Sequence, residues 1–308
     1  MLGWRRHQSG PGWLAFAPLA GRVRMAHVVC AEGTRPVLRW ADTADWSDPA
    51  RALRGLRRSR GVERLRSVAL LQRHEYQWLP LDAPDVPREE WADALRWSLK
   101  DMVDFPVDSA GIALLEVPGA PAARRRAQLI AVAAAHAHLA PLAAAGTDAG
   151  APWHAIDVPE TALRNIAALL GAPGQGQALL HTGETHSSLV VTADGELLLA
   201  RHIDVSLAQL TDANEDTRTQ AFERASLELQ RTLDSVERQF SHVRLAGVQV
   251  VPGALLADFI TYARELVYVP VVGFDLAQAI DLSAVPELSD PAVQAAFLPA
   301  IGAALRGD

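Results

Sequence analysis

Two histidines around a glycine form the pattern in this chain that comes nearest to a metal site. His181 and His186 lie five residues apart, with Gly183 between them. Imidazole nitrogens bind zinc, but even a catalytic zinc site needs three protein ligands in suitable geometry. The pair would therefore require a third ligand from elsewhere in the chain. We interpret both residues as loop histidines and predict no metal site.

Other patterns that could carry chemistry lack the context that they need. His136 and His138 alternate as on one face of a strand, with no carboxylate or cysteine close by in the sequence. The glycines of the segment 171–176 resemble a dinucleotide fingerprint, but they follow an expected helix and precede an expected strand, the reverse of the required order. Cys30 has no motif around it, and no G-x-S-x-G elbow occurs. None of these patterns predicts a catalytic centre.

A dense run of arginines lies between Arg51 and Arg66. Such a run could attract anionic lipid head groups or an acidic partner, whereas charge runs commonly cover the solvated face of a helix. Both interpretations stay open, and we favour the solvated face. The arginines of the run are at positions 51, 54, 57, 58, 60, 64 and 66.

Composition sets the broad class of the protein. The chain has 308 residues, 49% of them hydrophobic and 21% charged, which is enough to build a large core or two modest ones. The net charge of −7 argues against a nucleic-acid partner, because such proteins are usually basic. A single cysteine, Cys30, excludes an internal disulfide and fits a reducing compartment.

Membrane spans and a secretory leader are not expected. The most apolar stretch, 127–145, is rich in alanine and contains His136, His138 and Pro141, so it falls short of the roughly 20 strongly apolar residues of a span. Arg5 and Arg6 are not followed by an adequate apolar region. We therefore expect a cytoplasmic protein.

The hydrophobic pattern predicts a mixed α/β fold. A helix should begin at Pro49, with Asp48 as its N-cap, and another should bury a stripe that starts at Phe222. The expected strands are 13–18, 22–30, 35–40, 67–72, 76–81, 112–117, 128–134, 178–180, 187–192, 197–203, 248–251 and 269–272. The expected helices are 49–60, 87–101, 159–170, 217–240, 254–266 and 291–305.

A pattern of three strands and a helix occurs twice, which suggests an internal duplication around an inserted block. We predict a first lobe over residues 1–83 and an inserted α/β subdomain over 84–170. The second lobe should cover 171–308, with its C-terminal helix returning to the first lobe.

Several segments, in order along nearly the whole chain, resemble the PilM family and its relative MshI, which serve type IV and MSHA pilus biogenesis. The cytoplasmic domain of the type II secretion protein GspL belongs to the same superfamily as these proteins. The segments are Glu75-Tyr76-Gln77-Trp78-Leu79, 86–90, 94–97, 157–165, 227–234, 236–240 and 300–306.

The resemblance implies the α/β actin-like ATPase (RNase H-like) fold, with two lobes and an inserted subdomain. It also implies a scaffold, peripheral to the inner membrane, that binds the cytoplasmic N-terminal peptide of a PilN-like membrane protein. That peptide would occupy a groove between the first lobe and the insert. We predict that Trp78, Leu79, Trp91 and Leu95 border the groove, although Trp91 and Leu95 could instead be core.

The resemblance also places three nucleotide loops on this chain, and each departs from the family pattern. The first, 13–21, has no carboxylate or hydroxyl, and Pro18 lacks an N–H. The second has His181 where the family has aspartate, and Glu184 comes one residue after Gly183. The third, 251–254, keeps one glycine. The remnants of the site would be Gly21, Gly183, Thr185 and Gly253.

Because Mg²⁺ requires oxygen ligands, these losses predict a pseudo-ATPase rather than an enzyme. Binding of ATP and Mg²⁺ without turnover stays open. Two alternatives to the scaffold also stay open: an active actin-like ATPase that drives pilus assembly, and a GspL-like component of type II secretion.

Overall fold

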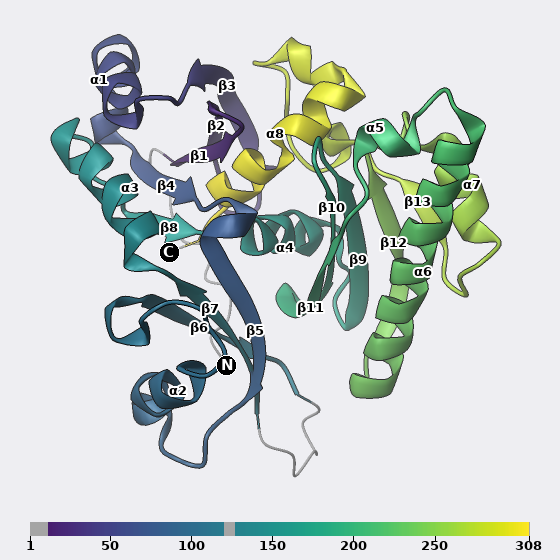
Figure 1. Ribbon diagram of the computed structural model, residues 1–308. Helices are drawn as coiled ribbons and strands as arrows, with labels where there is room; N and C mark the ends of the chain where they lie inside the picture. The colour runs from purple at the N-terminus through teal and green to yellow at the C-terminus, as the bar shows by residue number, and fades with distance from the viewer. Residues whose placement is uncertain (1–11, 120–126, 308) are drawn as a thin grey trace.

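The computed structural model describes residues 12–119 and 127–307, so Arg5 and Arg6 lie outside the described part. The described residues form two five-stranded sheets and one three-stranded sheet. Figure 1 shows one large sheet in each of two lobes, with the small sheet beside the first lobe.

The first sheet has the strand order β3-β2-β1-β4-β8, in which β1 pairs antiparallel with β2 and parallel with β4. Helix α1 (Pro49–Arg60) connects β3 to β4 and confirms the predicted boundaries. Asp48 caps its first turn, Pro49 occupies its first position, and Gly61 ends it in the left-handed conformation. The strands are β1 (Trp13–Leu19), β2 (Arg22–Val29), β3 (Val37–Asp45), β4 (Arg66–Leu70) and β8 (Ala155–Asp157).

The insert is built on an antiparallel sheet of order β5-β7-β6, where β5 is Tyr76–Asp82, β7 is Gln128–Ala134 and β6 is Gly111–Val117. Helix α2 (Trp91–Leu99) packs its buried face on one side of this sheet. Because β5 belongs to this sheet, the predicted boundary after residue 83 falls one strand too late.

The chain then returns through α3 (His136–Asp148), which packs against α1. His136 and His138 therefore lie in the first turn of a helix, and their predicted place on a strand is wrong. The strand β7 ends at Ala134, and the alanine-rich run that follows favours a helix. Among residues 12–119 and 127–307, no helix is long and apolar enough to cross a membrane.

The second large sheet has the order β11-β10-β9-β12-β13. Helix α6 (Glu215–Gln239) packs on it with the predicted apolar stripe, from Phe222 to Val236, fully or almost fully buried. Helices α5 (Leu207–Leu210) and α7 (Ala257–Arg264) complete this outer layer. The strands are β9 (Gln175–Thr182), β10 (Ser187–Ala193), β11 (Glu196–Ile203), β12 (Arg244–Val251) and β13 (Val271–Gly273).

Two helices lie between the large sheets. Helix α4 (Pro159–Leu170) contacts β9, β10 and β11, whereas α8 (Pro291–Ala304) contacts β1, β2 and β4. The two helices cross at Gly302, where a Cβ would lie 2.2 Å from the backbone oxygen of Ala162. Because α4 covers the second sheet and α8 the first, their crossing couples the lobes.

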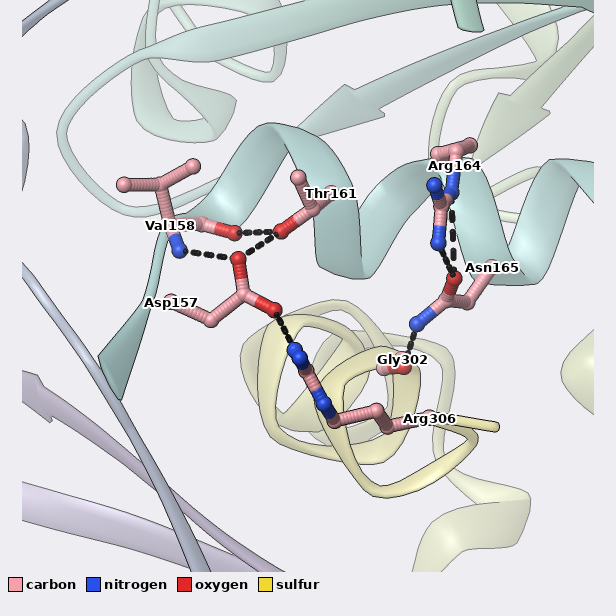
Figure 2. A network of polar contacts seen from close by, with 7 residues as sticks. All are labelled: Asp157, Val158, Thr161, Arg164, Asn165, Gly302 and Arg306. Carbon is pink, nitrogen blue, oxygen red and sulfur yellow. Dashed lines mark hydrogen bonds and ion pairs between the residues drawn. The ribbon is translucent and has the colours of Figure 1, made fainter. Parts of the chain in front are cut away.

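Two polar contacts connect α4 and the segment before it to α8 and the residues after it (Figure 2). The side-chain amide of Asn165 donates to the carbonyl of Gly302 at 2.9 Å, and the Arg306 guanidinium pairs with Asp157 at 2.6 Å. Asp157 also accepts from the backbone N–H of Val158 at the start of α4. Two of the family-like segments, 157–165 and 300–306, are thus direct neighbours in space.

A second connection joins the lobes along β3. The segment before α8 runs beside the start of this strand, where Leu38 donates its N–H to the carbonyl of Asp281 at 3.0 Å. Asp281 donates in return to the carbonyl of Pro36 at 2.8 Å. The Arg35 guanidinium donates to the carbonyl of Ile280 at 2.8 Å. The lobes are therefore linked on two sides.

Candidate functional site

The first predicted nucleotide loop is a two-residue hairpin turn between β1 and β2. Ala20 and Gly21 both have positive φ, 50° and 73°, as the tight turn of a twisted hairpin requires. The carbonyl of Gly21 accepts the N–H of Trp46 at 2.8 Å. Gly21 is thus required by the turn itself, and no polar side chain of the turn points toward a ligand.

The second predicted loop joins β9 to β10, and its groups are bonded within the protein. The N–H of Gly183, which a phosphate would need, donates to the carbonyl of His186 at 2.9 Å. The Thr185 hydroxyl lies 2.9 Å from Nδ1 of His186. His181 is buried, and its Nε2 contacts the carbonyl of Ala295 in α8 at 2.7 Å. Burial lowers the pKa of His181 to about 4, so this imidazole is neutral at neutral pH.

The third predicted loop follows β12, and packing explains its glycine. Gly253 is buried, and a Cβ on it would lie 2.5 Å from the Cα of Gly273 at the end of β13. The carbonyl of Gly253 accepts the N–H of Leu256 at 3.3 Å. Glycine at this position allows two backbone segments of the second lobe to touch, and this packing explains the residue without a nucleotide.

An ion pair that the sequence did not suggest connects β2 of the first lobe to the second predicted loop. The guanidinium of Arg24, on β2, donates to the carboxylate of Glu184, in the β9–β10 turn. The carboxylate that follows Gly183 in this loop is therefore held by the opposite lobe. A sequence signal for this pair does not exist, because its partners lie 160 residues apart.

Basic groups also gather beside the second loop. The rings of His186 and His202 lie 4.4 Å apart. Burial is the main reason that the pKa of His186 falls to about 4, and the neighbouring His202, His181 and Arg73 lower it further. In the described part of the chain, no group of three or more His, Cys, Asp or Glu residues is placed to hold a metal ion.

Arg73 belongs to a second polar cluster, in which Tyr76 donates its hydroxyl proton to the carboxylate of Glu160 at 2.5 Å. The Arg73 guanidinium lies over the Tyr76 ring, 5.4 Å from its centroid. Burial raises the pKa of Glu160 and that of Tyr76. This contact ties β5 of the insert to the start of α4, so both residues hold the insert in place.

A largely apolar groove of about 500 Å³ lies where the insert meets the first lobe. One wall comes from β6 and β7 of the insert, a second from α3, and a third from the segment 152–158 that contains β8. Both β6 and β8 are outer strands of their sheets. The lining includes Ile112, Leu115, Val132, Leu139, Trp153 and Ile156.

The four residues predicted to border a groove do not line this one. Leu79, Trp91 and Leu95 pack together in the core between α2 and the insert's sheet, and the indole N–H of Trp91 donates to the carbonyl of Val86 at 3.2 Å. Trp78 lies opposite Val132 in the sheet and packs on the main core. Of these two paired residues, Val132 lines the groove and Trp78 does not.

Comparisons with known proteins identify the fold. No protein-family model and no curated protein matches the chain. A solved PilM–PilN type IV pilus biogenesis complex matches with a TM-score of 0.71 at 19% identity, over 96% of this chain and 98% of that chain. The predicted fold class, an α/β actin-like ATPase fold with two lobes, is confirmed.

Two further structures resemble the chain less closely. The cytoplasmic domain of EpsL, an inner membrane component of the type II secretion system of Vibrio cholerae, has a TM-score of 0.44 at 12% identity, over 66% of this chain and 75% of that chain. A protein of Bacteroides thetaiotaomicron with an actin-like ATPase fold has a TM-score of 0.46 at 9% identity, over 94% of this chain and 99% of that chain.

Proposed function

We propose that this protein is a cytoplasmic scaffold of a type IV pilus machine, MSHA-like by its resembling segments, and that its groove binds the cytoplasmic N-terminal peptide of a PilN-like inner-membrane protein. The observation that carries the proposal is the apolar groove between the insert and the first lobe. A structure that the chain matches over 96% of its length comes from a PilM–PilN type IV pilus biogenesis complex.

The shape and lining of the groove suit a short extended peptide. Ile112 and Leu115 on β6, Val132 on β7 and Trp153 supply apolar surface for side chains. Because β6 is an outer strand of its sheet, we propose that an extended peptide adds to its open edge. Such pairing would supply affinity, and the apolar pockets would supply selectivity.

The nucleotide loops support a scaffold over an ATPase. Mg²⁺ would need a carboxylate, and Glu184 is engaged by Arg24. A phosphate would need backbone N–H groups, and that of Gly183 is used within its own turn. We therefore propose that the fold has kept its partner groove while its nucleotide site has degenerated. Membrane localisation would then follow from the partner rather than from a span.

The test is binding of a synthetic peptide that matches the N-terminal cytoplasmic segment of a PilN-like inner-membrane protein from the same organism. We expect a Kd in the micromolar range or below, about −8 kcal/mol, measured by calorimetry. Affinity should be equal with and without Mg-ATP. Absence of measurable binding would defeat the proposal.

Two neighbouring alanines of α3 give a matched pair of variants. Ala143 lines the groove, and Ala144 is exposed on the same helix outside it. An arginine at position 143 should fill the groove and abolish peptide binding, whereas Ala144→Arg should leave the Kd within about twofold. Equal loss in both variants would show that the peptide binds elsewhere or that the helix was disturbed.

A further inference from the structure

Helix α1 concentrates positive charge on a protein that is negative overall. Its 12 residues include Arg51, Arg54, Arg57, Arg58 and Arg60 and no Asp or Glu, while the whole chain has a net charge of −7. A solvated helix face of ordinary composition would mix both signs. The helix is therefore a basic patch on an otherwise acidic protein.

The periodicity of the helix separates three of these arginines from the others. Leu53 and Leu56 are buried and define the inner face. At about 100° per residue, Arg51, Arg54 and Arg58 lie within one narrow sector on the opposite side. All three are exposed. We call these three residues the arginine face.

The other two arginines of α1, Arg57 and Arg60, contact neighbouring parts of the first lobe. Arg57 donates to the carbonyl of Ala149 at 3.4 Å, and Arg60 pairs with Asp42 at 2.8 Å while lying over the ring of Trp40. By contrast, Arg54 and Arg58 form no ion pair with any other described residue. Their charges are therefore not neutralised by a close carboxylate.

The acidic groups nearest to α1 are committed elsewhere or lie at its N-terminal end. Asp42 binds Arg60, and Asp48 caps the helix by accepting the N–H of Arg51. Hydrogen bonds from the backbone and the hydroxyl of Ser47 lower the pKa of Asp45, and the nearby Arg51 lowers it further. The partnered carboxylates Asp45 and Asp48 therefore lie near Arg51, at one end of the arginine face.

The form of the arginine face favours a flat anionic surface as its partner. A protein interface usually centres on a buried aromatic or apolar anchor, and here Gly55, with open space around it, lies between the arginines. Extended nucleic acid would also meet the rest of the molecule, which is acidic, since the whole chain with α1 included has a net charge of −7. A bilayer can touch the convex helix alone.

We propose that the arginine face of α1 binds anionic lipid head groups at a bilayer surface. The contact goes beyond the proposed function and does not depend on the peptide groove. It would nevertheless bring that groove near the membrane, because Arg57 joins α1 to the segment 149–150, next to the groove residues Pro152 and Trp153.

The proposal can be tested by co-sedimentation of the full chain with vesicles. The wild type should bind vesicles that contain phosphatidylglycerol and should not bind vesicles of phosphatidylcholine alone. Raising the salt from about 0.1 M to about 1 M should release it, because the Debye length falls from about 10 Å to about 3 Å. The triple variant Arg51→Gln, Arg54→Gln, Arg58→Gln should bind on the order of a hundredfold more weakly, from about 1 kcal/mol for each arginine.

A control with the same change of charge on the second lobe is Arg224→Gln, Arg238→Gln, Arg244→Gln, at three exposed positions. It should bind the vesicles as the wild type does. Both triple variants should keep the melting temperature of the wild type and the affinity for the PilN-like peptide. Loss of vesicle binding with peptide binding retained is specific to α1, so the two proposals can fail separately.

Three results would overturn the proposal: no binding of the wild type to anionic vesicles, equal binding to neutral vesicles, or an equal loss in both triple variants. Salt-sensitive binding to duplex DNA without vesicle binding would likewise refute it and assign the patch to nucleic acid.

Discussion

His181 shows how a residue that looks like a metal ligand becomes part of the core. The sequence places it beside a glycine and five residues before a second histidine. In the structure its Nε2 contacts the carbonyl of Ala295, on the helix that joins the lobes. A neutral imidazole with one N–H satisfies that carbonyl, so the residue serves packing and hydrogen bonding.

The buried imidazole predicts a specific dependence of stability on pH. The folded pKa of His181 is about 4, below the ordinary value of 6.5, so below pH 6.5 the unfolded chain takes up a proton that the folded chain does not. Its contribution to stability is complete above pH 6.5 and is lost as the pH falls toward 4. The loss should reach about 3 kcal/mol at 1.36 kcal/mol per pKa unit.

The variant His181→Gln should lose this part of the pH dependence, because glutamine can still donate to Ala295 but does not titrate. Urea unfolding of both proteins between pH 7 and pH 4 would measure the difference. Parallel curves for the two proteins would mean that another group accounts for the acid sensitivity.

At the scale of elements, the contact between α4 and α8 fixes how the two large sheets lie relative to each other. Each helix packs on the sheet of a different lobe, and at Gly302 the two backbones are too close for a Cβ. Asn165 donates to the carbonyl of Gly302 itself, and Arg306, just after α8, pairs with Asp157, just before α4. Small residues allow the two helix backbones to approach, and the hydrogen bonds set their register.

Gly302→Ala should therefore destabilise the protein although alanine is the better helix former. The new Cβ would lie 2.2 Å from the oxygen of Ala162, and relief requires the helices to separate. We expect a cost of about 1–3 kcal/mol in the free energy of unfolding, measured by denaturant titration.

The control is Gly55→Ala in the exposed part of α1, where a Cβ would meet no atom within 4 Å. It should stabilise the protein by about 0.5–1 kcal/mol, the ordinary gain of alanine over glycine in a helix. A neutral or stabilising Gly302→Ala would show that the α4–α8 contact adapts freely.

At the scale of the whole molecule, contacts within the protein hold the two lobes together. The α4–α8 crossing, the β3–Asp281 contact and the Arg24–Glu184 ion pair link them at three separate places. The first is a contact between packed helices and the second consists of backbone hydrogen bonds, so separating the lobes would expose apolar surface and break these bonds. The third is half-exposed, since 52% of the Glu184 side chain is accessible, so it contributes at most about 1 kcal/mol.

We therefore expect Mg-ATP to have little effect on the whole molecule. A ligand that binds the native state raises the melting temperature once its concentration exceeds its Kd. Millimolar Mg-ATP should therefore leave this temperature unchanged. Mg²⁺-dependent hydrolysis should equal the background rate. Turnover that Glu184→Ala abolishes would contradict the prediction and would make Glu184 the missing carboxylate.

Local chemistry determined much of the secondary structure. The cap at Asp48, the proline at 49 and Gly61 delimit α1 within a short window, and the apolar stripe that begins at Phe222 identifies α6. These signals act between residues at most a few positions apart, so they can be found in the sequence. They failed at His136, where strand-like alternation competed with the helix preference of the alanines that follow.

Tertiary contacts decided the site. β5 pairs with β7 rather than with the first sheet, and β8 joins that sheet through Val68 and Ala155, 87 positions apart. The groove draws its walls from three separate stretches of the chain, so Trp91 and Leu95 fitted the expected chemistry but lay in another core. Composition and periodicity tell which residues are buried. Which of them face a groove depends on how sheets and helices meet, and that is settled by packing between residues distant in the chain.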